Sequence, residues 1–339
     1  MVTFFLVVQA YDVASSQRHR EFDGCCFGSL EIIFNLDGQR HQKQRNRSMR
    51  WEGGKKSENL EDRRNMAPAT VAAGGIGVVL VMLVAAFMGI DPKQAQKFIG
   101  NGAGNGGNRG GGQVKRELTA EEAKSGEFFK TVLNYTEEVW DEQFRKAGEK
   151  YVQPKMVLFS EQVATGCGNA PSAVGPFYCP ADRTVYLDPT FFEELKQKMG
   201  GSDAEFSQAY VVAHEIGHHV QNLLGYSSIV DEVRQTKSKT EANHASVRLE
   251  LQADYLAGVW AHYGQQKFKF VESGDIAAAM KSANAIGDDR LQKNSRGFTS
   301  PESYTHGTSE QRIKWFRLGL QTGDLGALKE LFSLPYNEL

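Results

Sequence analysis

Apolar residues return every three or four positions between residues 202 and 225, which is the spacing of one face of a helix. Ser202 with Glu205 forms a capping box before this run, and Gly225 is a stop signal after it. We therefore predict an amphipathic or buried helix here. Its repeating apolar positions are Phe206, Tyr210, Ala213, Gly217, Val220 and Leu224.

Similar patterns predict further helices, and two short apolar runs have the composition of strands. The predicted strands are Val157–Phe159 and Val185–Asp188. One predicted helix begins after Thr119, and another covers 191–199. A third contains Val247–Trp260 and ends near Gly264. Two more cover 275–286 and 311–320. Many helices with few strands indicate the α+β fold class.

One segment, Ala67–Ile90, has no charged side chain and predicts a single N-terminal transmembrane helix. At about 1.5 Å per residue it is long enough to cross the roughly 30 Å hydrocarbon core of a bilayer. The basic residues that precede it predict a cytoplasmic N-terminus, with everything after Ile90 outside the cytoplasm. These basic residues are Arg50, Lys55, Lys56, Arg63 and Arg64.

The patterns divide the chain into five parts. Residues 1–48 have no sustained period, so we expect a non-native extension from a wrongly assigned start codon, or a disordered one; a targeting segment is the alternative. Residues 49–66 are a short cytoplasmic segment before the transmembrane helix at 67–90. Residues 91–118 are a linker rich in Gly and Asn. Residues 119–339 form the globular domain.

The charge balance bears on partners. The chain of 339 residues has a net charge of −2, and 24% of its residues are charged. Nucleic-acid binding needs a positive field, which this balance does not supply. We therefore predict no nucleic-acid partner.

His214, Glu215 and His218 form the pattern H-E-x-x-H inside the first predicted helix. Residues four apart lie above one another on a helix, so His214 and His218 can bind one Zn²⁺ ion through their imidazoles. Glu215 then lies beside the metal, where its carboxylate can take a proton from zinc-bound water. The alternative is a pair of helical histidines that make ordinary hydrogen bonds.

Glu250 and Asp254 are also four apart, in the later helix that contains E-L-Q-A-D. A catalytic zinc has three protein ligands and keeps one position open, so Glu250 is the candidate third ligand. Asp254 is placed to accept the outer N–H of a ligand histidine, which fixes the tautomer of that ring. A solvated acidic face of the helix is the alternative.

H-E-I-G-H-H followed by E-L-Q-A-D resembles the glutamate-type zincins. With M-R-W-E-G-G-K-K-S-E-N-L-E-D-R-R and G-C-G-N-A-P-S-A-V-G-P-F-Y-C-P, the chain from about Met49 to near its end resembles the bacterial neutral zinc metallopeptidases with one membrane anchor. The resemblance implies a zincin-like fold, Glu215 as base, and an inner-membrane protein with its catalytic domain in the periplasm. By the same analogy, the region of Val185–Asp188 offers a strand edge to an extended substrate.

Thr305–Ile313 resembles the histidine-containing segment near the end of the CaaX-type and heat-shock zincins. His306 is therefore a candidate catalytic residue, donating a hydrogen bond to the oxyanion that forms during attack on a peptide carbonyl. Tyr304 is a weaker candidate, and a packing role for His306 is the alternative. His219 points about 100° away from His218 on the helix, and His244 is off the ligand face, so neither is an expected ligand.

Cys167 and Cys179 flank a stretch rich in Gly, Pro and Ser. In a domain outside the cytoplasm, two such cysteines indicate a disulfide that closes a small loop. A second zinc site is the alternative, but it lacks further cysteines nearby. We therefore predict a disulfide between Cys167 and Cys179.

Together these features predict a membrane-anchored zinc metallopeptidase that acts on a polypeptide substrate and contacts the lipid bilayer. Two other functions remain open. One is a zinc-binding, chaperone-like or scaffold protein of the cell envelope without turnover. The other is a protease with its active site inside the membrane, which is disfavoured because over a hundred residues separate the apolar run from H-E-x-x-H.

Overall fold

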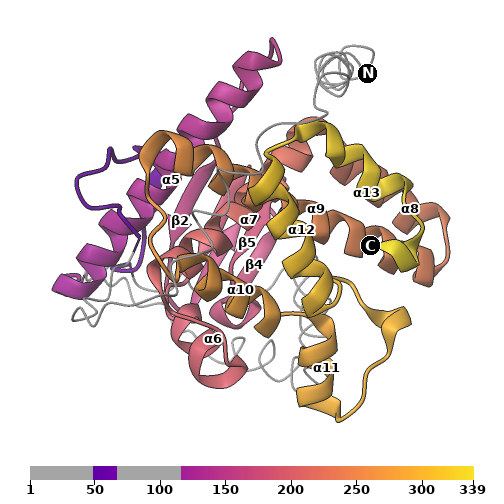
Figure 1. The fold of residues 1–339 in the computed structure, drawn as a ribbon. Helices are drawn as coiled ribbons and strands as arrows, with labels where there is room; N and C mark the ends of the chain where they lie inside the picture. The colour runs from indigo at the N-terminus through magenta and orange to yellow at the C-terminus, as the bar shows by residue number, and fades with distance from the viewer. Residues whose placement is uncertain (1–48, 67–115) are drawn as a thin grey trace, which may run out of the picture.

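The structure is a computed structural model that describes residues 49–66 and 116–339. Its helices lie against a small sheet in a helix-rich α+β arrangement (Figure 1). The predictions for residues 1–48, for the transmembrane helix at 67–90 and for most of the linker at 91–118 lie outside the described residues. Within 49–66 and 116–339, every helix is too short or too polar to cross a membrane.

The main sheet has the strand order β1-β2-β6-β5. β1, β2 and β6 are parallel, and β5 runs antiparallel to β6 at the end of the sheet. A separate hairpin consists of β3 and β4. The strands span Leu60–Asp62 (β1), Lys155–Leu158 (β2), Gln162–Thr165 (β3), Gly168–Pro171 (β4), Phe177–Cys179 (β5) and Thr184–Leu187 (β6). The predicted strands at 157–159 and 185–188 thus correspond to β2 and β6.

Side chains alternate between the two faces of the sheet, as the pleat requires. Met156 and Leu158 of β2 belong to the main core, which the helices share. Val157, between them, packs with Tyr186 of β6 in a smaller second cluster that also contains Val163 of β3. The helices therefore cover one face of the sheet, and the β3–β4 hairpin lies over the other.

The long helices are α5, α7, α9 and α12, and the predicted helical segments are all helical. The helices span Ala120–Lys146 (α5), Phe191–Met199 (α6), Glu205–Leu224 (α7), Tyr226–Thr236 (α8), Lys239–Phe268 (α9), Asp275–Ala285 (α10), Asp288–Arg296 (α11), Ser309–Thr322 (α12) and Glu330–Ser333 (α13). The capping box predicted at Ser202 is wrong, because Ala204 is the N-cap of α7 and Ser202 Oγ accepts the N–H of Ala204 instead. Gly225 ends α7 in the left-handed conformation, as expected.

Two close helix crossings build the centre of the main core. A Cβ at Gly217 of α7 would lie 3.0 Å from the carbonyl oxygen of Ala253 on α9. A Cβ at Gly319 of α12 would overlap the carbonyl oxygen of Tyr255, also on α9. Glycine at these positions therefore allows α7 and α12 to approach the backbone of α9 directly.

Residues 49–66 are packed on the domain, whereas the sequence predicted a cytoplasmic segment separate from it. Met49 and Trp51 are 2% and 7% exposed and belong to the main core. Leu60 begins β1, which pairs with β2 along the edge of the sheet. Only a few apolar residues, at irregular spacing, make this contact, so the hydrophobic periodicity of the sequence did not predict it.

Cys167 and Cys179 form a disulfide, which confirms the predicted pair. Cys167 lies in the turn between β3 and β4, and Cys179 ends β5. The bridge therefore ties the hairpin to the last strand of the main sheet.

We expect reduction of this disulfide to lower the free energy of unfolding by about 3 kcal/mol, because the open chain gains loop entropy when it unfolds. Urea unfolding of the purified protein with and without reductant measures the difference. The double variant Cys167→Ser/Cys179→Ser is the control, and its midpoint should not respond to reductant. Equal midpoints for the oxidised and reduced wild type would contradict the expectation.

Candidate metal centre

His214 and His218 lie one turn apart on α7 and face Glu250 of α9. One donor atom from each of these three residues falls within 4.8 Å of the others. Glu250 Oε2 is 3.2 Å from His214 Nε2, and Glu250 Oε1 is 3.5 Å from His218 Nε2. The two helices thus bring together the residues predicted as ligands.

The outer nitrogens of both imidazoles have partners that fix the tautomers. His214 Nδ1 lies 2.9 Å from Asp254 Oδ1, and His218 Nδ1 lies 2.8 Å from Gln221 Oε1. Both partners are acceptors, so each Nδ1 donates its hydrogen, and each Nε2, which faces Glu250, is the nitrogen that can offer a lone pair to a metal once it has lost its proton. Two imidazole nitrogens and one carboxylate form the donor set of many zinc hydrolases, so these residues fit Zn²⁺.

Asp254 is completely buried, and several donors surround its carboxylate. Tyr210 of α7 donates its hydroxyl to Oδ1 at 2.6 Å, and Arg312 of α12 donates Nε to Oδ2 at 2.8 Å. Burial alone would raise the pKa of Asp254, but Arg312 and His214 outweigh it and hold the pKa at about 2. Sequence reasoning missed Tyr210 and Arg312, although i and i+4 spacing before His214 pointed to Tyr210.

Neighbouring histidines keep Glu250 ionised. Burial raises its pKa, but the cationic forms of His306 and His218 lower the pKa well below its ordinary value. Burial lowers the pKa of His214, yet Asp254 and Glu250 raise it to about 10. A metal ion at this centre must therefore displace a proton from His214, so acid should weaken metal binding.

Glu215 is 8% exposed and lies beside the ligand set. Burial raises its pKa above the ordinary value of a glutamate, and His218 and His214 counter only part of that rise. A backbone hydrogen bond from Tyr178 of β5 also lowers it. A carboxylate with a raised pKa accepts and returns protons more readily near neutral pH.

His306 lies on the loop before α12, with Nε2 3.9 Å from Glu250 Oε1. Asp288, at the start of α11, holds this loop. Its Oδ2 accepts the backbone N–H groups of Thr305, His306 and Gly307 at 2.7, 2.7 and 3.1 Å. The structure thus brings His306 to the ligand set, and Asp288, which sequence reasoning missed, fixes the loop that carries it.

The other two candidate histidines lie away from the three donor atoms. His219 donates Nε2 to the Val152 carbonyl at 2.6 Å and accepts the Tyr178 hydroxyl at Nδ1. Burial lowers its pKa to about 4, so it is neutral at pH 7. His244 stacks on the ring of Tyr336. Neither ring belongs to the donor set, as the helical geometry predicted, and both make structural contacts.

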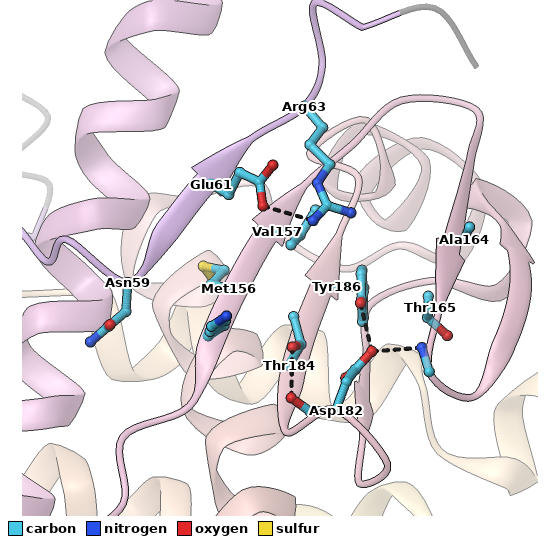
Figure 2. Close-up of a pocket in the computed structure, with 12 residues that line it drawn as sticks. Asn59, Glu61, Arg63, Met156, Val157, Ala164, Thr165, Asp182, Thr184 and Tyr186 are labelled. Atoms are coloured by element: carbon cyan, nitrogen blue, oxygen red, sulfur yellow. Dashed lines mark hydrogen bonds and ion pairs between the residues drawn. The ribbon is translucent and has the colours of Figure 1, made fainter. Parts of the chain in front are cut away.

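A pocket of about 390 Å³ lies on the hairpin side of the sheet, where Ala164 and Thr165 of β3 face Tyr186 of β6 (Figure 2). Its polar wall includes the Glu61–Arg63 ion pair, and Asp182 accepts hydrogen bonds from Tyr186 and the backbone of Gly166. None of the three candidate ligands, His214, His218 and Glu250, lines this pocket. The candidate chemistry therefore lies on the helix side of the sheet.

Comparison with known proteins adds the family. Residues 49–330 match the model of a family described as "Putative neutral zinc metallopeptidase". The chain belongs to this family. It is 43% identical over 286 residues to the Escherichia coli K12 protein named "Uncharacterized protein YpfJ", an alignment that covers 81% of this chain and 96% of that protein.

A second relative is "Uncharacterized protein Rv2575" of Mycobacterium tuberculosis H37Rv. It is 49% identical over 183 residues, which are 51% of this chain and 61% of that protein. No solved structure gave a significant match. The family resemblance inferred from H-E-I-G-H-H and E-L-Q-A-D is confirmed, and the family name agrees with a metal at the three donor residues.

We expect Glu250→Ala to lower zinc affinity more than about 100-fold, the upper range for loss of an outer-shell partner, because it removes a direct ligand. Elemental analysis of the purified protein measures zinc per chain. Glu232→Ala removes an exposed glutamate of α8 and is the matched control, which should keep the wild-type zinc content. Full zinc retention in Glu250→Ala would exclude Glu250 as a ligand.

We expect Arg312→Met to lower the free energy of unfolding by about 3–5 kcal/mol, because it leaves the buried Asp254 carboxylate without its cation. Urea unfolding measures the loss. Arg317→Met is the control on the same helix; Arg317 is exposed, and its replacement should change stability by less than about 0.5 kcal/mol. Similar small losses in both variants would show that the ion pair does not hold the centre together.

Proposed function

We propose that this protein is a zinc metallopeptidase that hydrolyses peptide bonds with Glu215 as general base. The observation that carries the proposal is the convergence of His214 Nε2, His218 Nε2 and the Glu250 carboxylate, with Glu215 beside them. The family description supports the same reaction class. Zn²⁺ bound there would polarise the peptide carbonyl and acidify water.

The protein's own residues carry the proton transfers. Glu215 accepts a proton from the attacking water and delivers it to the leaving amine. His306 Nε2 donates a hydrogen bond to the oxyanion that develops on the carbonyl oxygen. Asp254 holds His214 in the tautomer that presents Nε2 to the metal.

β5 is the strand to which we assign the extended substrate. The analogy that assigned Val185–Asp188 is wrong, because β6 is paired with β2 on one side and β5 on the other. β5 is the last strand of the sheet, and its Tyr178 contacts Glu215. A peptide added to β5 as a further strand would bring its backbone to the proposed base.

We also propose that the enzyme works at the inner membrane, with its catalytic domain in the periplasm. The apolar run at 67–90 in the sequence supports contact with the bilayer. The Cys167–Cys179 disulfide supports an oxidising compartment, because such bonds are rare in the bacterial cytosol.

Glu215→Gln tests the mechanism, because glutamine has nearly the same shape but cannot accept the proton. We expect the variant to keep its zinc and to lose about 10²–10⁴-fold in the rate of peptide cleavage. Mass spectrometry of a mixed peptide library incubated with the zinc-loaded protein measures cleavage. Glu232→Gln, an exposed change on α8, is the matched control and should cleave like the wild type.

Two outcomes would count against the proposal. Cleavage by zinc-loaded Glu215→Gln at the wild-type rate would exclude Glu215 as the base. If zinc-loaded wild type cleaves no peptide of the library or of the cell envelope, the zinc-binding scaffold becomes the better interpretation.

A further inference from the structure

Residues 49–66 are joined to the domain by a hydrophobic contact at their start. Met49 and Trp51 are buried in the main core. The ring of Trp51 meets Phe128 of α5 edge to face, with 5.4 Å between the ring centroids. Burial of side chains of this size contributes roughly 1.5–3 kcal/mol each. Burial of these two side chains therefore stabilises the contact between residues 49–51 and the domain.

Backbone hydrogen bonds continue the attachment along the segment. β1 pairs with β2 in the register Leu60↔Met156, and the Met156 N–H donates to the Asn59 carbonyl at 3.0 Å. The Arg63 N–H donates to the Leu158 carbonyl at 2.8 Å. Neighbouring strands lie only about 4.8 Å apart, so this pairing requires both strands in one folded body.

A buried carboxylate of α5 depends on the same segment. Glu137 is 5% exposed, and its Oε1 accepts hydrogen bonds from Ser57 Oγ and Asn59 Nδ2, each at 2.7 Å. Without these donors, Glu137 would lose two of the hydrogen bonds that offset its burial. The domain is thus built to receive residues 57–59.

Three of the five basic residues that predicted a cytoplasmic N-terminus contact the domain or are buried against it. Arg50 pairs with Glu272 at 2.6 Å, and Lys56 pairs with Glu127 of α5. Arg64 is 4% exposed; it pairs with Asp62 and donates to the Glu122 carbonyl. These three charges have a role in docking, so their position before an apolar run does not by itself require a cytoplasmic location.

We infer that residues 49–66 and 116–339 lie in the same compartment, as one folded domain. A single crossing between Met66 and Arg116 would put roughly 30 Å of hydrocarbon between β1 and β2. The β1–β2 hydrogen bonds and the buried Glu137 contacts exclude that separation. The inference replaces the predicted division, in which residues 49–66 lie in the cytoplasm and residues 116–339 lie outside it, and is independent of the proposed peptidase activity.

Glu52 and Lys124 offer a matched pair of labelling sites. Both side chains are exposed, and Lys124 Nζ lies 3.5 Å from Glu52 Oε1, so the two sites are neighbours in the folded domain. Glu52→Cys and Lys124→Cys are made singly in the full chain, with Cys25 and Cys26 changed to serine. A membrane-impermeant maleimide is then applied to spheroplasts and to inside-out membrane vesicles.

We expect both cysteines to react from the same side of the membrane. Reaction of both from outside supports the inference and the periplasmic location together. Reaction of both only from the cytoplasmic side still supports a shared compartment, while it contradicts the periplasmic location. Reaction of Glu52→Cys from the cytoplasm and Lys124→Cys from outside would overturn the inference.

A cross-link tests the docking itself. The double variant Glu52→Cys/Lys124→Cys carries a protease site inserted near residue 105 and is treated in membranes with a short bis-maleimide. After proteolysis we expect the two pieces to stay joined, whereas Glu52→Cys alone should separate. Complete separation in the double variant, with both thiols consumed by the reagent, would show that residues 49–66 are not docked on α5.

Discussion

The buried carboxylate of Asp254 is the interaction on which the metal centre depends. It comes from α9, accepts hydrogen bonds from Tyr210 and His214 of α7, and pairs with Arg312 of α12. An ionised carboxylate with no exposed surface is tolerated only when charges and donors surround it, so all three helices must keep their places. The same carboxylate orients a ligand histidine, and the packing requirement and the chemical requirement therefore coincide.

Close backbone contact makes this arrangement geometrically possible. Gly217 lies one residue before His218 and lets α7 rest on the backbone of α9 at Ala253, next to Asp254. A Cβ at Gly217 would be tight against the Ala253 backbone, so α9 would have to give by a few tenths of an ångström at the point where the candidate ligands of the two helices meet. The glycine in H-E-I-G-H-H thus sets the distance between two ligands on one helix and the third on another.

Helical periodicity was enough to predict α7 and α9. The two i, i+4 pairs, His214 with His218 and Glu250 with Asp254, were enough to predict four residues that the structure brings together. They did not predict Arg312 or Asp288, because both act through tertiary contacts: Arg312 pairs with Asp254 of α9, and Asp288 accepts the backbone N–H groups of the loop at 305–307. β1 was missed because three residues paired at a sheet edge leave almost no periodic signal. The capping box at Ser202 failed because Ala204 took the N-cap position, and the Ser202 hydroxyl bonded to that residue.

His219, the third histidine of H-E-I-G-H-H, has a separate structural role. It points to the other side of α7, where its ring accepts the hydroxyl of Tyr178 on β5 and donates to the Val152 carbonyl. Asn222, one turn later, also donates to that hydroxyl. β5 is therefore fixed to α7 through Tyr178 and to the hairpin through Cys179, which holds the last strand of the sheet beside Glu215. The position of the proposed substrate strand thus follows from side-chain contacts of α7, although these contacts lie outside the candidate metal site.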